Sequence, residues 1–478
     1  MIKDSQVQQA ISAEEKRQQN WMELIASENY QSKHVLEVQS SVFANKYAEW
    51  FPWRRYYWWQ ENTDKIEQLA IDRAKELFKS DHANVQALSW AAANLCFYTS
   101  VMNPGDTILW MDLSHWGHLT HWAPVTFFSK VFNFQRYGTK SDWSIDFNQL
   151  EKLALECKPK IILAGFSAYP RELDYAKFAE IWKKVWAILY ADLSHIWGFI
   201  AAWELKNPFD YGFHAMMTTT HKSLRWPRWA LILSKWIVSN PLKKPEDTIE
   251  NLPTRIDRAV SPGMQGGPHM NTVAWIAVAL WEAQTSEFKN YAHQTLINAK
   301  TLAEEMLKYW YKLVTWWTDN HMIVMDFSGE SFTWWDIEKV LDKVWISTSK
   351  STIPDDPNPP FNPSGLRIGM QAMTTRGVKE DDTKHIARFI HEAIQNKSSN
   401  VFSIIFIYSP RGHSLHSNSK SWRIKWWIRI IWNRRFRCRN SNFIQNFLNI
   451  SSCKAFTRKI HHYHMIICSS CNEFISIL

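Results

Sequence analysis

The sequence predicts an α/β fold, with a mostly parallel sheet in a large domain and a small α+β domain toward the C-terminus. Short apolar runs with the length of buried strands occur four times, as TILWMDL at 107–113, KIILAGFSA at 160–168, AILYADLSH at 187–195 and ALILSK at 230–235. Helical periodicity lies between them, for example over Tyr175–Val185. Apolar strands that alternate with helices indicate a parallel sheet covered by helices, which binds ligands beyond the carboxyl ends of its strands.

The order of these patterns divides the chain into four predicted regions. Residues 1–60 form an N-terminal arm that begins with a polar helix. Residues 61–270 form the large domain, and residues 271–400 form a connecting helix and the small C-terminal domain. Residues 401–478 are an anomalous basic tail.

Individual elements follow from local periodicity. Apolar residues recur on one face of Thr63–Phe78, which predicts an amphipathic helix. The Pro-rich, polar segment Glu246–Met264 is expected to be a linker or an excursion from the domain. A long helical stretch follows at roughly 270–311, and a final helix is expected near Asp381–Gln395.

Composition favours a cytoplasmic globular protein. The 478 residues suffice for two or three domains. No apolar run approaches the roughly 18–20 residues of a membrane helix, and the charged N-terminus has no apolar signal core. Cys96 and Cys157 are the only cysteines before residue 400, too few for a disulfide framework. We therefore expect a cytoplasmic location and no membrane partner.

The net charge of +9 belongs to the tail. Residues 401–478 hold twelve of the 55 basic and one of the 46 acidic residues, which leaves 43 basic and 45 acidic residues in 1–400. A near-neutral body argues against nucleic acid as its partner. The tail itself has two interpretations. It is a basic nucleic-acid or metal-binding extension with Cys468, Cys471 and nearby histidines as ligands, or a frameshifted or read-through segment, which we favour because the spacing matches no zinc pattern well.

Tryptophan is abundant where turns favour glycine. Residues 1–400 contain 25 Trp and 13 Gly, whereas ordinary usage would give roughly 28 Gly in such a span. Trp58–Trp59 and Trp316–Trp317 are adjacent pairs in loop-like sequence. Gly permits a positive φ angle that Trp resists. Either a codon that the source organism reads as Gly, most simply UGA, appears here as Trp, or the protein is genuinely Trp-rich.

Two polar positions are candidates for chemistry beyond the predicted strands. Lys222 lies in TTTHKSL after three threonines, and a buried lysine with a lowered pKa forms Schiff bases. Asp192 ends the strand in ADLSH, with His195 three residues later. A buried carboxylate can keep a pyridinium nitrogen protonated. The alternatives are a solvated loop lysine and a helix-capping aspartate.

Two further patterns suit anionic groups. Ser89 to Ala91 form a small-residue loop before a helix, where backbone N–H groups can bind a phosphate if position 90 is not bulky. Arg367 lies between two glycines in SGLRIGM, and a guanidinium can bind a carboxylate through two parallel hydrogen bonds. Small residues at a helix start are common, and a single arginine more often forms a surface ion pair.

Taken together, the motifs resemble the serine hydroxymethyltransferase family. The matching segments span roughly residues 8–397 in the family's order and include ELIASENY (23–30), NKYAEWFP (45–52), ADLSHIWG (191–198), TTTHKSLRWPR (218–228), PGMQGGPHM (262–270) and SGLRIG (364–369). Nearly every Trp before residue 400 falls where that family usually has Gly. The resemblance implies a fold-type I transferase dependent on pyridoxal phosphate. It also implies reversible transfer of the serine hydroxymethyl group to tetrahydrofolate, which gives glycine and 5,10-methylenetetrahydrofolate.

The resemblance also implies site residues, with no metal. Lys222 would carry the cofactor and Asp192 would pair with its ring nitrogen. Catalytic roles are implied for Lys222, Glu49, His221, Asp192 and His118. Cofactor contacts are implied for Ser89, Ala91, His118, Ser167, Asp192, His195, Thr219, Lys222, and Gly266 and Gly267 across a homodimer interface. Substrate contacts are implied for Ser27, Tyr47, Glu49, Tyr57 and Arg367, and folate contacts for Leu113, Gly117, His118, Leu119, Ser351, Pro359, Pro360 and Phe361.

Two positions depart from the family pattern, and two other functions compete. Ala91 stands where many members have Ser, and Ser351 stands where Asn is often found. One alternative is a folate-independent aldolase that uses the same cofactor on β-hydroxy amino acids. The other is a cofactor-free relative that acts as a binding or regulatory protein, against which Lys222, Asp192 and Arg367 argue.

Overall fold

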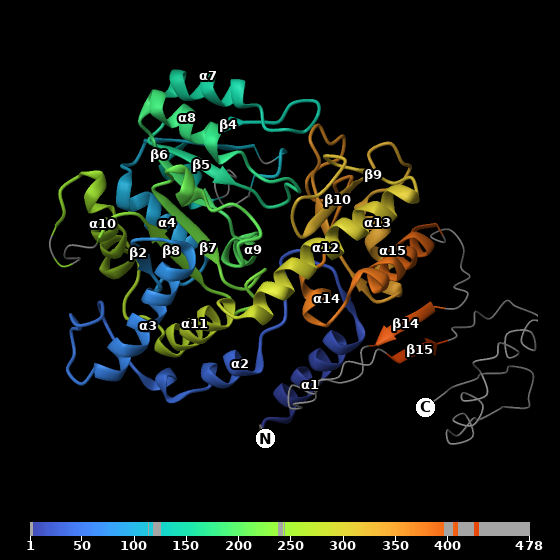
Figure 1. Cartoon of the computed structure of the whole chain (residues 1–478), viewed down its shortest axis with the longest axis horizontal. Helices are drawn as coiled ribbons and strands as arrows, with labels where there is room; N and C mark the ends of the chain where they lie inside the picture. The colour runs from blue at the N-terminus through green and yellow to red at the C-terminus, as the bar shows by residue number, and fades with distance from the viewer. Residues whose placement is uncertain are drawn as a thin grey trace, which may run out of the picture. The chain divides into compact units, whose positions relative to one another are not determined.

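The computed structural model describes residues 3–112, 114–117, 126–237, 242, 244–395, 405–409 and 425–429. The described residues up to Gln395 belong to one compact unit. Its elements, coloured along the chain, are labelled in Figure 1.

A seven-stranded sheet with the order β2-β8-β7-β6-β5-β3-β4 forms the centre of the large domain. The strands are β2 (His82–Asn84), β3 (Thr107–Met111), β4 (Asn133–Tyr137), β5 (Ile161–Gly165), β6 (Ile188–Asp192), β7 (Ala215–Thr219) and β8 (Ala230–Ser234). The neighbouring strands from β7 to β4 pair in parallel, whereas β8 pairs antiparallel with both β7 and β2. The four predicted apolar strands are confirmed as β3, β5, β6 and β8.

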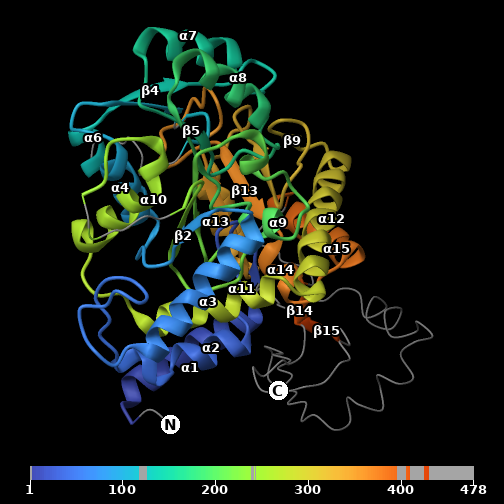
Figure 2. The same cartoon turned by 60° about the vertical axis from the view of Figure 1, so that its left-hand side comes forward.

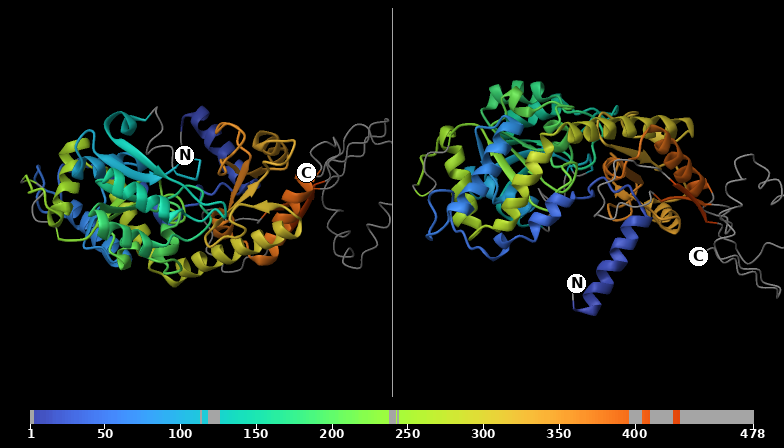
Figure 3. Two further views of the ribbon diagram at one scale, coloured as in Figure 1. Left: turned by 90° about the horizontal axis from the view of Figure 1, so that it is seen from above. Right: turned by 60° about the horizontal axis from the view of Figure 1, so that its bottom comes forward.

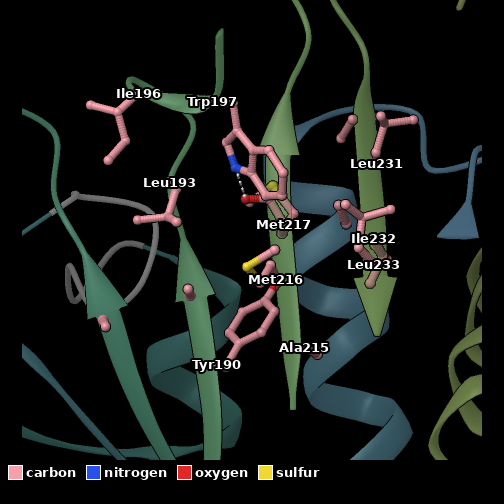
Figure 4. Packing of buried hydrophobic residues seen from close by; sticks show 14 of the residues in the cluster. Tyr190, Leu193, Ile196, Trp197, Ala215, Met216, Met217, Leu231, Ile232 and Leu233 are labelled. Atoms are coloured by element: carbon pink, nitrogen blue, oxygen red, sulfur yellow. Dashed lines mark hydrogen bonds between the residues drawn. The ribbon is translucent and has the colours of Figure 1, made fainter. Parts of the chain in front are cut away.

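Buried apolar side chains line both sides of these strands. Every residue of β5, β6, β7 and β8 is buried. Figure 4 shows Tyr190, Met216, Met217 and Ile232 packed around neighbouring strands, with Trp197 Nε1 donating a hydrogen bond to the Met217 carbonyl at 2.9 Å. Parallel strands buried on both faces need continuous apolar sequence. Because β5, β6 and β7 run in the same direction, the residues that follow them meet at one edge of the sheet.

Helices cover the sheet, as the predicted alternation requires. They are α3 (Glu61–Phe78), α4 (Trp90–Val101), α6 (Phe127–Val131), α7 (Phe147–Cys157), α8 (Tyr175–Val185), α9 (Trp197–Ala201), α10 (Leu252–Arg258), α11 (Met270–Ala283) and α12 (Ser286–Lys308). The helix predicted at 63–78 is confirmed as α3, which lies beside α11, as Figure 2 also shows.

The structure refines two expectations for the middle of the chain. The helical stretch predicted at roughly 270–311 is confirmed but is divided at Gln284 and Thr285, where the Thr285 hydroxyl accepts a hydrogen bond from the Phe288 N–H and starts α12. The segment expected to be a linker is mainly helical, with a 3-10 turn at Ile249–Asn251, α10, and a wide turn at Ala259–Met264. Proline is tolerated in the first turn of a helix, and buried apolar residues anchor α10.

The small domain contains a four-stranded antiparallel sheet with the order β12-β13-β10-β9. Its strands are β9 (Lys312–Leu313), β10 (Met322–Asp326), β12 (Ser349–Ser351) and β13 (Gly365–Gly369), and its helices are α13 (Trp334–Lys343), α14 (Gln371–Thr375) and α15 (Glu380–Gln395). Helix α12 contacts both α9 of the large domain and α15 of the small one.

The N-terminal segment joins the small domain through a short strand. Strand β1 (Met22–Glu23) pairs in parallel with β11 (Ile346–Ser347), and the Gly369 N–H donates to the Leu24 carbonyl at 2.8 Å. A side chain at position 369 would lie 2.5 Å from the Ala26 Cα, so this close approach requires glycine. Helix α2 (Lys33–Gln39) and a 3-10 turn at Val42–Asn45 follow.

Helix α1 (Ser5–Asn20) has no buried residue and points away from the neighbouring elements in the right-hand view of Figure 3. Its polar character agrees with the predicted helical arm. In the tail, the described residues form β14 (Ile405–Ser409) and β15 (Lys425–Arg429), which pair as a two-stranded sheet. The cysteines and histidines predicted as tail ligands lie outside the described residues. Within the described part of the chain, no helix is long and apolar enough to cross a membrane.

Candidate active site

Lys222 lies in a turn just after β7, at the carboxyl edge of the sheet, and is only 5 % exposed. Burial lowers the pKa of Lys222 to about 7, while the negative charge of Asp192 acts in the opposite direction. A lysine with this pKa is partly neutral at neutral pH, and the neutral amine is the form that attacks carbonyl groups. Lys222 is therefore suited to covalent bonding with an aldehyde.

The backbone around Lys222 is held by residues distant in sequence. Asn29 Nδ2 donates to the Lys222 carbonyl at 3.0 Å, and the Tyr291 hydroxyl donates to the Ser223 carbonyl at 3.2 Å. The Gly198 N–H donates to Ser223 Oγ at 2.9 Å, and a Cβ at position 198 would lie 2.6 Å from the Ser223 carbonyl oxygen. These contacts fix the direction from which the Lys222 side chain enters the site.

Asp192 is the last residue of β6, on the strand next to β7, and is 3 % exposed. One carboxylate oxygen accepts from Ser194 Oγ at 2.8 Å and from the Ser194 N–H at 3.3 Å. The other oxygen accepts from Asn94 Nδ2 of α4 at 3.2 Å and from the indole Nε1 of Trp90. Hydrogen-bond donors to both oxygens orient the carboxylate. One of these donors, Nε1 of Trp90, is part of an aromatic ring.

The Trp90 indole contacts both groups that the sequence predicted to face a cofactor ring. Its Nε1 donates to Asp192, and Lys222 Nζ lies 5.0 Å from the centroid of the indole ring. An aromatic ring with an N–H group therefore fits between the buried ammonium and the buried carboxylate. The side chain of Trp90 therefore occupies the space between Lys222 and Asp192.

His195 and His321 stack beside Asp192. Their ring centroids are 5.7 Å apart with an interplanar angle of 20°, and His321 Nε2 lies 3.2 Å from the Ala26 carbonyl oxygen. Burial lowers the pKa of His321 to about 3, which keeps the ring neutral. Sequence reasoning did not select His321, Asn29, Asn94 or Trp90 as site residues, although Asn29 belongs to the quoted segment ELIASENY.

The three threonines before Lys222 differ in their contacts. The hydroxyls of Thr218 and Thr220 donate to backbone carbonyls, so they are not directed at a ligand. Thr219 Oγ1 and His221 Nδ1 are buried and have no hydrogen-bond partner among the described residues. Burial lowers the pKa of His221 to about 3. Thr219 and His221 thus keep polar atoms available for a ligand.

Ser89 and Ala91 flank Trp90 at the start of α4, and both are exposed. Ser89 is the N-cap residue, yet its side chain makes no capping hydrogen bond. The first N–H groups of a helix attract anions. The predicted phosphate-binding loop therefore has the expected position, directly beside the ring that contacts Asp192.

Arg367 lies in the central part of β13 and points toward the large domain. Its Nε donates to Ser349 Oγ at 3.0 Å, and one terminal nitrogen donates to the Ser167 carbonyl at 2.7 Å. Burial lowers the pKa of Arg367 to about 10, and the positive charge of Arg367 contributes to the lowered pKa of Lys222. The structure thus places the charge of Arg367 close enough to Lys222 to affect its pKa, and ties Arg367 to Ser167 by a hydrogen bond.

Two of the predicted folate segments meet at Trp116. The Trp116 Nε1 donates to the Thr352 carbonyl at 3.0 Å, next to Ser351, and Gly117 follows Trp116 in the chain. The Ser167 hydroxyl and N–H both donate to the Trp116 carbonyl. This region therefore adjoins the partner of Arg367. Phe361 is 71 % exposed after Pro359 and Pro360, and Leu113, His118 and Leu119 lie outside the described residues.

A second group of predicted residues gathers around two glycines. Tyr47 and Tyr57 form an edge-to-face pair with ring centroids 5.8 Å apart. Partial desolvation raises the pKa of Tyr57, and the negative charge of Glu49 adds to this effect. A Cβ at Gly267 would lie 3.1 Å from the Tyr47 ring, and one at Gly266 would lie 3.8 Å from its hydroxyl. Tyr47 and Tyr57 are exposed, so this group presents polar atoms at the surface.

Ser27 occupies a half-buried turn after β1, next to Ala26. The Ala26 carbonyl faces His321 Nε2, and Gln371 Nε2 donates to the Ile25 and Glu28 carbonyls. The turn that carries Ser27 is therefore fixed against the small domain beside the stacked histidines.

A mostly parallel sheet with a buried lysine and a buried carboxylate at the ends of adjacent strands defines the class of fold-type I enzymes that use pyridoxal phosphate. The sequence profile of the serine hydroxymethyltransferase family matches residues 1–390. The chain belongs to the serine hydroxymethyltransferase family. Members of this family are transferases dependent on pyridoxal phosphate that move a hydroxymethyl group between serine and glycine.

Three of the described residues around the site suit this cofactor, and one does not. Lys222 suits its aldehyde, Asp192 suits its ring nitrogen, and Thr219 has a buried hydroxyl without a partner among the described residues. Trp90 does not fit, because its indole hydrogen-bonds to the carboxylate that the cofactor nitrogen would need. Two aromatic rings cannot occupy the same volume in a closely packed interior. The chain with Trp90 therefore leaves no room for the cofactor in this arrangement.

Proposed function

We propose that this protein catalyses reversible transfer of the serine hydroxymethyl group to tetrahydrofolate, which gives glycine and 5,10-methylenetetrahydrofolate, when position 90 leaves room for the cofactor. The observation that carries the proposal is the buried Lys222, whose pKa is lowered to about 7, opposite the buried Asp192 across the space of one aromatic ring. Bound there, pyridoxal phosphate would supply an electron sink for bonds at the amino-acid Cα.

The protein's own residues have separate tasks in this proposal. Asp192, oriented by Ser194 and Asn94, offers a carboxylate to a ring N–H in the geometry that Trp90 Nε1 now adopts. Thr219 and His221 offer polar atoms near the N-terminus of α4, where Ser89 and Ala91 leave the backbone exposed. The three donors would hold a phosphate beside the ring.

Substrate recognition would rest on Arg367. Its guanidinium lies beside Ser167 and Ser349 at the edge of the site, and a carboxylate can accept two hydrogen bonds from it. Ser27 and Tyr57 would assist in orienting the amino acid. Glu49, with Tyr47 nearby, is our candidate for proton transfer at the serine hydroxyl.

The folate would bind near position 116. The segments that contain Gly117 and Ser351 meet there. The carbonyl of residue 116 accepts a hydrogen bond from Ser167, and the Ser167 carbonyl accepts one from Arg367, so this region lies next to the substrate-binding arginine. Pro359, Pro360 and Phe361 supply an exposed apolar edge in the same part of the small domain. This adjacency supports a site in which the one-carbon unit passes directly between the two substrates.

We also propose that the working assembly is a homodimer in the cytoplasm. Tyr47, Tyr57 and Glu49 gather around Gly266 and Gly267 at the surface. Such an exposed group could complete the site of a second copy by adding acid–base and phosphate-binding atoms. Helix α1, with no buried residue, offers further surface for the same contact.

The test is an assay of the protein purified from its source cells. Conversion of serine to glycine should depend on added tetrahydrofolate, and the purified protein should show the visible absorbance of bound pyridoxal phosphate. A Lys222→Ala variant should lose that absorbance and its turnover, whereas Lys152→Ala, on the exposed side of α7, should keep both. Full activity without tetrahydrofolate would instead indicate a folate-independent aldolase.

A further inference from the structure

Eleven tryptophans adopt a backbone conformation that side chains resist. Among the described residues, sixteen non-glycine residues have a positive φ, and eleven of them are tryptophans, namely Trp50, Trp53, Trp59, Trp116, Trp143, Trp186, Trp203, Trp236, Trp310, Trp316 and Trp345. Only a few per cent of non-glycine residues adopt a positive φ, and bulky ones are rarer still. Tryptophan, the largest side chain, therefore occurs repeatedly at positions whose positive φ favours glycine.

These positions end helices and form turns, which are the usual sites of glycine. Trp186 is the C-cap of α8 at φ 56°, and its N–H donates to the Trp182 carbonyl. Trp310 follows α12 at φ 65°, with the N–H of Tyr311 donating to the Met306 carbonyl. This hydrogen-bond pattern closes a helix through a left-handed residue, most often glycine.

Packing does not explain the choice of tryptophan at three exposed turns among these positions. Trp310 is 94 % exposed, Trp186 is 77 % exposed and Trp203 is 71 % exposed. A tryptophan that stabilises a fold does so by burying its ring. These three indoles gain little burial in return for an unfavourable backbone angle.

Position 90 supplies an independent observation. Trp90 is the first residue of α4, and a helical backbone accommodates a side chain without strain. Its indole instead occupies the space between Lys222 and Asp192 that the cofactor needs. Removal of that side chain would leave one ring-sized space, lined by a lysine, a carboxylate and the start of a helix.

We propose that the functional protein carries glycine at position 90 and at the eleven positions with positive φ, because the codon written here as tryptophan is read as glycine in the source organism. One translation event explains both observations. The argument from φ is independent of any activity, whereas the argument at position 90 rests on the proposed function.

The direct test is tandem mass spectrometry of the protein isolated from its source cells. We expect peptides that span positions 90, 186, 203 and 310 to carry glycine, with masses lower than those of the printed sequence by one indolylmethyl group at each position. Tryptophan in these peptides would overturn the proposal. This measurement does not involve the cofactor or the reaction, so its failure would leave the proposed function to be judged by its own assay.

A second test isolates position 90. Two chains are expressed with glycine at the eleven positive-φ positions, and they differ only in whether Trp90 is retained or replaced by glycine (Trp90→Gly). Each is titrated with pyridoxal phosphate and followed by visible absorbance, with circular dichroism to confirm that both fold. We expect saturable binding with glycine at position 90 and no binding at the same concentrations with Trp90. Equal binding by the two folded chains would refute the assignment of glycine at position 90.

A third test compares the thermal stability of the chain that carries all its tryptophans with that of chains carrying glycine at selected positions. We expect the chain with glycine at the eleven positions to unfold at a higher temperature than the printed chain. A chain with glycine at the helical positions Trp182, Trp275 and Trp281 instead should unfold at a lower temperature. The reverse order would count against glycine at the turns.

Discussion

At the scale of single residues, Lys222 links protein stability to pH. Its pKa is lowered by burial to about 7, from a value of 10.5 for an exposed lysine. Between these two pH values the unfolded chain binds the proton more tightly, so folding is penalised below pH 7 and the penalty fades as the pH rises toward 10.5. The buried lysine is thus a stability cost that function requires.

Lys222→Met should remove this cost from the cofactor-free protein. The difference in unfolding free energy between variant and parent should be about 2 kcal/mol larger at pH 7 than at pH 9. The reason is that a difference of one bound proton changes the unfolding free energy by ~1.4 kcal/mol per pH unit. Urea unfolding at both pH values measures the difference. Lys152→Met, at an exposed lysine, should behave alike at both. A gain for Lys222→Met that does not change with pH would mean that Lys222 is not desolvated.

Arg367 permits a second prediction at this scale. Arg367→Ala should weaken serine binding about 100-fold, because it removes a charged two-hydrogen-bond contact worth ~3 kcal/mol. Arg367→Lys keeps the charge but not the planar pair of donors, so we expect an intermediate loss. Serine titration of the cofactor-loaded protein measures both affinities. If cofactor and serine affinities fell equally, Arg367 would have a structural role rather than a carboxylate-binding one.

At the scale of elements, the position of a tryptophan relative to a helix end determines whether it is expected to lower the stability of the fold. Trp310 and Trp281 can be compared because both side chains are exposed, at 94 % and 48 %, but only Trp310 has a positive φ. Trp310→Gly should stabilise the protein by about 1 kcal/mol, the usual cost of a left-handed conformation with a side chain. Trp281→Gly, within α11, should destabilise it by a similar amount.

Thermal unfolding of these two variants and their parent provides the measurement. Opposite shifts in melting temperature are expected, and both variants should keep the far-ultraviolet spectrum of the parent. Destabilisation by Trp310→Gly would show that the indole contributes more through contacts than its backbone angle costs. That result would weaken the argument for glycine at the other exposed turns.

Elements with clear periodicity could be predicted from the sequence, and those set by distant contacts could not. Thr63–Phe78 and the four apolar strands were found because each carries a full period of apolar residues. The break at Gln284 and Thr285 was missed, since one capping hydroxyl between two helical segments leaves the periodicity almost unchanged. The segment around α10 was taken for a linker because its prolines and charges conceal two buried anchors, Leu252 and Ile256.

The same distinction applies to the candidate site. Lys222 and Asp192 were selected as candidates by residue type and by the family resemblance, whereas β7, the strand that brings Lys222 beside Asp192, was not predicted. Asn29, which binds the carbonyl of Lys222 from 193 residues away, and the stacking of His321 on His195 depend on tertiary packing that no local pattern encodes. The position of the Trp90 ring also required coordinates, although the bulk of Trp90 in a phosphate-type loop was already out of place.

At the scale of the whole molecule, buried neutral histidines should make the protein sensitive to acid. Burial lowers the pKa of His214 to about 4 and those of His221 and His321 to about 3. The unfolded chain binds protons on these residues below about pH 6.5, so stability is lost as the pH falls from 6.5 toward 4. His214 and His321 come directly before β7 and β10, and His221 lies in the site turn, so this cost is spread through the core rather than confined to one surface.

His214→Gln offers the cleanest test of this account, because His214 lies outside the candidate site. His214 Nδ1 accepts from the Leu189 N–H at 2.8 Å, and the glutamine amide oxygen can accept the same bond without taking up a proton. Between pH 7 and pH 5 the parent should lose about 2 kcal/mol of stability through His214 alone, and the variant should be spared that part. Urea unfolding at both pH values measures the difference, with His34→Gln, at a histidine that is 65 % exposed, as the control. A variant that loses as much stability as its parent would show that His214 is protonated in the fold, and acid sensitivity would then have to come from the buried carboxylates.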